Sequence, residues 1–288
     1  MIVNRGRLIN TLAGINGVVA GGVASIKLDC NRRYHRVILQ TGASGSPVSA
    51  ATLLPTLQLL VNGVKMWDIT PQEILNINAA IGLTQATGEM TLAFTDPTRK
   101  FIRRDTLNSW DMVGQSTFEI DAGIESGATT PTLTGIFEFD YIRNMKVPWG
   151  AAAGTPQAPF IQPFARHTYT FNLPGGISLL NTLPISSPIA RIWLRGSPVA
   201  QISALEILQD NNKVLDATVS QINQAYGDYG FTLGNASGAA GYDTAFIADP
   251  NGRPWLALKC QAELVLKVTT LESIVLTAVI ETLPGAYR

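Results

Sequence analysis

The two halves of this chain resemble each other, and that repeat constrains the fold more than any single motif does. Leu57–Leu60 recurs as Leu205–Leu208, 148 positions later. Further matches at the same separation set Asp68, Thr70, Glu73, Ile74 and Gly82 against Asp216, Thr218, Gln221, Ile222 and Gly230. The sequence therefore predicts one structural unit that is present twice.

The repeat continues downstream with altered spacing. Three later blocks match in the same order: Phe94–Arg99 with Phe246–Arg253, Gln115–Asp121 with Gln261–Lys267, and Leu133–Ile142 with Leu271–Ile280. Loops tolerate insertions better than the elements that they join. The changing separation therefore predicts equal elements joined by unequal loops.

A connector is predicted between the two copies. Residues 147–163 contain four prolines and two glycines and almost no charge, a composition typical of linkers. The sequence thus divides into an N-terminal arm at 1–24, a first unit at 25–146, a linker at 147–165 and a second unit at 166–288.

The N-terminal segment starts in a way that superficially matches a secretory signal, because Arg5 and Arg7 precede an apolar stretch. Asn10, Asn16 and several glycines interrupt that stretch. We therefore expect residues 1–24 to form a flexible arm.

Most of the remaining chain has an apolar period of two. The clearest segments are Ile26–Cys30, Phe118–Asp121, Phe137–Tyr141 and Tyr169–Leu173, in which one face is apolar and the other polar, as in half-buried strands. Clusters of Gly, Pro, Asn and Asp separate them, which favours a β-sandwich or barrel.

Each copy also carries one helix signal. Thr70 and Glu73 form a capping box, Pro71 occupies the first helical position, and Gly82 ends the pattern. Thr218 and Gln221 repeat the capping box in the second copy. One short helix at the same place in each β-rich half indicates a duplication.

Charge and hydropathy favour an assembling protein. The 21 basic and 21 acidic residues cancel, so nothing draws the chain as a whole to nucleic acid phosphates. Only 15% of residues are charged against 46% hydrophobic, which leaves few charges for a fully solvated surface. The longest apolar run, Leu271–Ile280, has the length of a strand rather than of a membrane span.

The sequence does not indicate an enzyme. Only His35 and His167 could serve as imidazole bases, and each stands beside an arginine at the start of an expected strand, where a structural role is favoured. Nucleophile-elbow, Walker A and paired-cysteine zinc motifs do not occur. We therefore assign no catalytic and no cofactor-binding residue, and a metal site stays unknown.

Other chemically capable residues also have structural interpretations. Glu119, Asp121, Glu138 and Asp140 could hold a hard cation between strands, but solvated strand faces are favoured. Cys30 and Cys260 are predicted to be buried free thiols. Among the five tryptophans, a sugar-binding platform is one reading. A core or subunit-contact role is favoured for Trp67 and Trp193.

The order of elements resembles that of corticovirus-type major capsid proteins, in the double jelly-roll lineage of tectivirus coat proteins and adenovirus hexons. The segments that carry the resemblance are Ala24–Leu28, Leu57–Gly82, Phe94–Arg99 and Gln115–Asp121 in the first half, and Arg166–Leu173, Ile189–Gly196 and Leu205–Gly230 in the second. The resemblance implies an all-β fold of two tandem jelly-roll β-barrels, each with one short helix.

The resemblance also implies a structural role. Three chains would form a pseudo-hexameric trimer, and such trimers would tile an icosahedral shell over the internal lipid membrane of a tailless dsDNA bacteriophage. The implied partners are neighbouring capsomers, a vertex (penton) protein and the membrane or its proteins, without direct contact to nucleic acid. The chain would be made in the bacterial cytoplasm and reside in the virion capsid. Calcium between subunits is possible at an unknown site, and Arg5 and Arg7 could reach the anionic membrane.

Two alternatives remain open. The first is a carbohydrate-binding or spike protein built from paired β-sandwiches, since jelly rolls also serve as lectins. The second is an enzyme on a β-scaffold, which the sparse histidines and cysteines disfavour.

Overall fold

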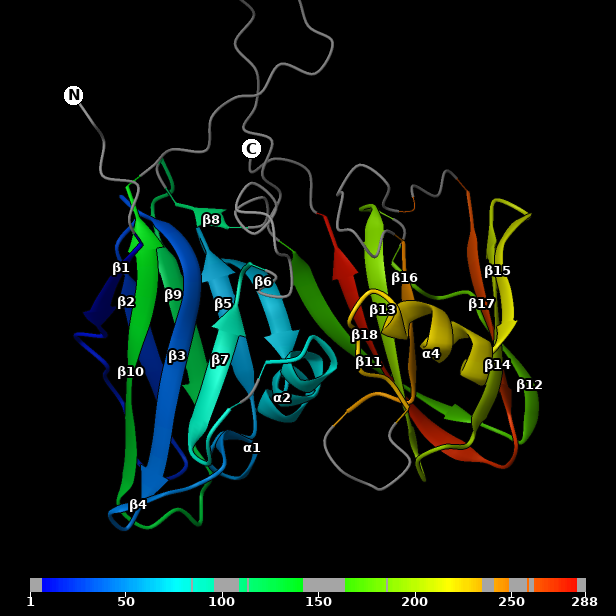
Figure 1. Cartoon of the computed structure of the whole chain (residues 1–288). Coiled ribbons are helices and arrows are strands. Elements are labelled where there is room, and N and C mark those ends of the chain that lie inside the picture. Colours follow the sequence, from blue (N-terminus) through cyan, green and yellow to red (C-terminus); the bar gives the residue numbers. More distant parts are fainter. Residues whose placement is uncertain are drawn as a thin grey trace, which may run out of the picture. The chain divides into compact units, whose positions relative to one another are not determined.

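The computed structural model describes the chain in segments, and the fold below refers to these residues: 7–83, 85–95, 109–112, 114–141, 164–184, 186–234, 241–248, 258 and 262–283. They form two compact units, coloured blue to green and green to red in Figure 1. Most of the predicted linker at 147–165 lies outside the described residues. None of the described helices is long and apolar enough to span a bilayer.

The first unit holds two antiparallel sheets. One has the order β1-β10-β3-β4, and β7 and β8 also pair with β3; its strands are β1 (Leu8–Thr11), β10 (Pro131–Asp140), β3 (Arg33–Ala43), β4 (Ser46–Pro47), β7 (Glu89–Ala93) and β8 (Trp110–Asp111). The other runs β2-β9-β5-β6, with bounds β2 (Val23–Leu28), β9 (Phe118–Gly123), β5 (Leu57–Val61) and β6 (Val64–Ile69). Figure 1 shows β3 and β10 side by side along the height of this unit.

The second unit has the same plan. One sheet runs β11-β18-β13-β16, with bounds β11 (Ala165–Leu173), β18 (Ile274–Thr282), β13 (Ile189–Ser197) and β16 (Thr244–Ile247). The other runs β12-β17-β14-β15, with bounds β12 (Gly176–Leu180), β17 (Leu264–Thr270), β14 (Ile202–Gln209) and β15 (Asn212–Thr218).

Eight strands of the first unit therefore have a counterpart in the second, whereas β4 and β8 have none among the described strands. β1, β2, β3, β5, β6, β7, β9 and β10 occupy the same sheet positions as β11, β12, β13, β14, β15, β16, β17 and β18. Even a β-bulge recurs, between Leu59 and Leu60 in one copy and between Ile207 and Leu208 in the other. The predicted all-β fold of two tandem jelly rolls is confirmed.

The helix predicted in each copy is present. Helix α2 (Pro71–Ala80) follows Thr70, whose hydroxyl accepts a hydrogen bond from the Glu73 N–H at 3.3 Å. Helix α4 (Val219–Gly227) follows Thr218, which forms a complete capping box with Gln221. The structure contains an additional helix, α1 (Ala50–Leu53), which no side chain caps and no sequence signal marks.

The expectation of a flexible arm at residues 1–24 is wrong for its described part. Leu8–Thr11 is strand β1, which pairs with Phe139 to Ile136 of β10. Arg7 just before it forms an ion pair with Glu138 at 3.2 Å. The pairing uses backbone groups of an edge strand, so it needs no apolar alternation, and the glycines nearby concealed it.

Large apolar side chains fill the space between the sheets of each unit. In the first, Trp67, Phe94, Trp110 and Phe118 have ring centroids 4.9 to 6.1 Å apart. In the second, Trp193 is buried beside Tyr242. Trp67 and Trp193 are therefore core residues, as predicted, whereas Trp149 and Trp255 lie outside the described residues.

One turn shows how closely the repeat is kept. Asn62 opens the β5–β6 turn at φ +52°, and its side-chain oxygen accepts hydrogen bonds from the N–H groups of Ser116 and Thr117, at 2.7 and 3.1 Å. Asp210 opens the β14–β15 turn at φ +48° and accepts from Ala262 and Glu263 at 2.8 and 2.9 Å. Each side chain ties a hairpin turn to the segment that leads into the neighbouring strand.

This tie gives the first testable expectation. Replacing Asn62 by glycine keeps a residue that tolerates the positive φ but removes the acceptor for two N–H groups. We expect a loss of about 1 kcal/mol in unfolding free energy, measured by urea denaturation. The matched variant Asp210→Gly should behave alike, and unchanged midpoints in both would contradict the role of the tie.

Candidate functional site

A buried ion cluster lies at the end of the strand that closes the first barrel. The carboxylate of Asp140 on β10 accepts from Arg33 Nε and Nη2 at 2.9 and 2.6 Å. Its Oδ2 also lies 2.8 Å from His35 Nε2. All three side chains are buried, so the cluster belongs to the barrel wall and offers no approach to a substrate.

The second barrel repeats this cluster with other side chains. Glu281 on β18 lies 2.8 Å from Arg166 Nε and 3.4 Å from Arg191 Nη1, and all three are buried. Burial lowers the pKa of the Arg166 guanidinium, and nearby Arg191 lowers it further, while Glu281 acts in the opposite direction. Each barrel thus closes on a carboxylate that is neutralised by arginine.

The sequence comparison missed this equivalence. Setting Leu133–Ile142 against Leu271–Ile280 places Asp140 opposite Ala278, whereas the strand ladders match it with Glu281, three positions further on. A β-bulge adds one residue to a strand, so a shift of three positions across a bulge still places apolar residues opposite apolar residues. The apolar pattern therefore cannot distinguish the two alignments. Only the ladder partners fix the register.

The expectation for the four strand carboxylates is wrong for two of them. Glu138 and Asp140 are buried and faced by arginines, Arg36 lying 2.7 Å from Glu138, so they are neither solvated nor free to hold a cation. Glu119 pairs loosely with exposed Lys27 at 3.5 Å. In the described parts of the chain, no three His, Cys, Asp or Glu side chains gather in a metal-binding arrangement.

The histidines and cysteines have structural surroundings where they are described. His35 belongs to the Asp140 cluster, and His167 is half-buried on β11. Cys30 is a free thiol, as predicted, but it is half-buried rather than buried, and burial is the main cause that raises its pKa. Cys260 lies outside the described residues.

The Glu281 cluster generates a stability prediction. Replacing Glu281 by glutamine removes the carboxylate charge that faces buried Arg166 and Arg191, and breaking a buried pair in this way costs about 3 kcal/mol. Urea denaturation should show the loss. The control Lys27→Ala, at the exposed pair, should change little, and equal effects of both substitutions would contradict the assignment.

Another buried carboxylate organises the β13–β14 turn. Asp243 accepts hydrogen bonds from the N–H groups of Gly196 and Ala200 at 2.7 and 3.2 Å. Burial raises the pKa of the Asp243 carboxyl above its ordinary value, although both hydrogen bonds and the charge of Arg195 act the other way. The group therefore holds its proton to higher pH in the folded chain than in the unfolded one.

This shift predicts a pH dependence. A folded pKa above the unfolded one means that the stability contribution of Asp243 increases as the pH falls through the folded pKa towards the lower pKa of the unfolded chain. The wild type should therefore gain stability relative to Asp243→Asn between about pH 7 and about pH 4. Thermal melts of both proteins across that range test the sign, and a difference that shrinks with falling pH would refute it.

Exposed apolar side chains gather on edge strands. On β1, Leu8 and Ile9 are 42% and 64% exposed, and on β12, Ile177 and Leu179 are 71% and 61% exposed. An exposed apolar edge strand is a liability for a free protein, because its backbone groups and side chains invite another chain. These edges are therefore candidate assembly surfaces.

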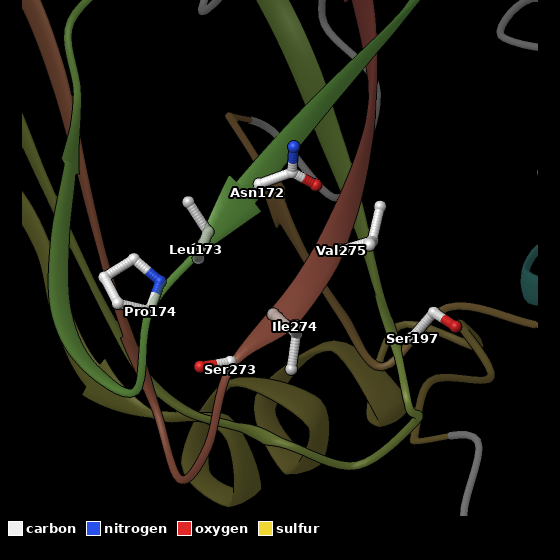
Figure 2. A pocket seen from close by; sticks show the side chains of 7 residues that line it. All are labelled: Asn172, Leu173, Pro174, Ser197, Ser273, Ile274 and Val275. Atoms are coloured by element: carbon white, nitrogen blue, oxygen red, sulfur yellow. The ribbon is translucent and has the colours of Figure 1, made fainter.

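An open pocket of about 410 Å³ lies at one end of the second barrel. Figure 2 shows that its lining comes from the end of β11, the start of β18 and the end of β13. The residues are Asn172, Leu173, Pro174, Ser197, Ser273, Ile274 and Val275. None of these seven is charged, so the pocket suits packing against a neighbouring surface rather than acid–base chemistry.

Comparisons with solved structures find viral capsid proteins with a similar fold. The major capsid protein P2 of Bacteriophage PM2 superposes with a TM-score of 0.76 at 20% identity, covering 96% of both chains. The Sulfolobus Turreted Icosahedral Virus structure gives 0.65 at 12% identity, covering 96% of this chain and 91% of that one. The PBCV-1 virus capsid gives 0.58 at 10%, covering 96% and 93%. No curated protein matches the sequence.

Fold and duplication together define a double jelly-roll protein, the class to which these viral capsid proteins belong. A comparison of the sequence with protein families adds a match in the first barrel. Residues 9–140 match the model described as Viral coat protein P2 N-terminal domain. That model describes a viral coat protein, which is a structural protein of a virion.

Proposed function

We propose that the chain is the major capsid protein of a tailless dsDNA bacteriophage, and that three copies form a pseudo-hexameric trimer. The observation that carries the proposal is the coat-protein match over residues 9–140, followed by a second barrel with the same order of strands. Two similar barrels in one chain give six in a trimer, which makes a nearly hexagonal tile from a threefold assembly.

The composition supports this role. A chain with 15% charged and 46% hydrophobic residues loses apolar surface to neighbours in a permanent assembly, whose interfaces are core-like. Neighbouring capsomers are the first partners. A vertex protein and an internal lipid membrane beneath the shell complete the proposed set.

The sugar-binding alternative has less support. Trp67, Trp110 and Trp193, the tryptophans in the described part of the chain, are all buried. A sugar platform needs accessible aromatic faces, and these rings are committed to the two cores.

The mass of the purified chain in solution tests the proposal. Light scattering should give a trimer, and electron microscopy of the same sample should show tiles of hexagonal outline or closed shells. A stable monomer that melts at higher temperature with a glycan would overturn the proposal in favour of the lectin-like reading. Repeating the measurement with a chelator tests whether calcium joins the subunits, which stays a prediction.

A further inference from the structure

The two helices at equivalent positions differ sharply in exposure. Both turn one apolar residue into their own barrel, Ile74 on α2 and Ile222 on α4, and both of these are buried. The residues that follow, towards and just beyond the C-terminal end of each helix, differ in exposure. We call Ile77, Ala80 and Ile81 the α2 outer face and their equivalents Ala225, Asp228 and Tyr229 the α4 outer face; the first is fully buried and the second exposed.

Unit membership explains why the α2 outer face is buried. Residues Leu75–Thr84 cluster with the second unit rather than the first. Within that unit, the Ala80 carbonyl accepts from the Thr232 N–H at 2.7 Å, and Asn76 Oδ1 accepts from the Gly241 N–H at 3.0 Å. The equivalent of Asn76 on α4 is Gln224, which is exposed.

The strands that precede the helices show the same difference. Trp67 on β6 is buried, and its indole N–H donates to the carbonyl of Phe164, the residue that leads into β11, at 2.8 Å. The equivalent of Trp67 on β15 is Leu215, which is only half-buried. The residues compared on the helix and on the preceding strand are thus buried in the first copy. Their equivalents in the second copy are exposed or only half-buried.

The strand that begins each barrel completes the comparison. β11 is partly buried along most of its length, whereas every residue of its equivalent β1 is exposed. We call Leu8 and Ile9 the β1 edge. Among the described residues, the β1 edge and the α4 outer face are thus exposed, whereas their equivalents β11 and the α2 outer face are partly and fully buried.

We infer that the β1 edge of one copy docks on the α4 outer face and β15 of a second copy. This inference rests on the proposed capsid function and names the surfaces of its trimer contact. Every chain offers one β1 edge and one α4 outer face. In an assembly of identical chains, each β1 edge therefore has one α4 outer face to pair with on another copy. A contact between two different surfaces of identical chains is head-to-tail, and its repetition closes into a ring when the rotation allows.

The chemistry of the α4 outer face fits a contact made after folding. Its Ala225, Asp228 and Tyr229 replace the more apolar Ile77, Ala80 and Ile81 of α2. A surface that meets water before assembly needs a polar component, and tyrosine is enriched in interfaces because it combines apolar area with a hydroxyl group.

Two single variants and their mixture test the inference. Ile9→Lys places a charge on the β1 edge, and Ala225→Arg places a bulky charge on the α4 outer face without weakening the helix. Each variant alone should be monomeric with an unchanged circular dichroism spectrum. Mixed together, the Ala225→Arg chain still offers an intact β1 edge and the Ile9→Lys chain an intact α4 outer face. The mixture should form a 1:1 dimer that cannot close into a ring.

The controls separate this inference from the proposed function. Leu271→Lys changes an equally exposed apolar residue, 70% accessible, outside both surfaces, and it should leave the trimer intact. Monomeric variants that stay monomeric on mixing would overturn the docking of these two surfaces, as would trimers formed by either variant alone. A monomeric wild type would instead overturn the trimer itself and with it the proposed function.

Discussion

The architecture depends on one constraint, the insertion of a late strand between two early ones. In the first barrel β10 lies between β1 and β3, and in the second β18 lies between β11 and β13. This ladder joins residues more than a hundred positions apart, such as Arg33 and Asp140. It also brings the arginines and the carboxylate of each ion cluster together. Backbone hydrogen bonds and the ion cluster therefore both stabilise the inserted strand in each barrel.

The sequence predicted features that depend on local chemistry. The capping residues Thr70 and Thr218 gave both long helices, and alternation gave strands such as β9 and β11. The repeat at a separation of 148 positions predicted the duplicated architecture. Hairpins, bulges and helices depend on residues that are close in the sequence, so they recur where the sequence recurs. The burial of Trp67 and Trp193 in the two cores agrees with the core role that the sequence favoured.

Features that depend on distant partners were not predictable. β1 has no periodic signal because β10 supplies its hydrogen bonds. Glu138 and Asp140 alternate with aromatic residues and so looked solvated, since the sequence does not show that arginines from β3 lie opposite them. Helix α1 is a single turn between strands, too short for a periodic pattern to mark it.

The assignment of Leu75–Thr84 to the second unit has a consequence for biosynthesis. All strands of the first barrel are complete once Asp140 has been synthesised, so this barrel can form while later residues are still being added. Ile77 and Ile81 then stay uncovered until the second barrel folds. A half-made chain therefore displays apolar side chains that a finished chain buries.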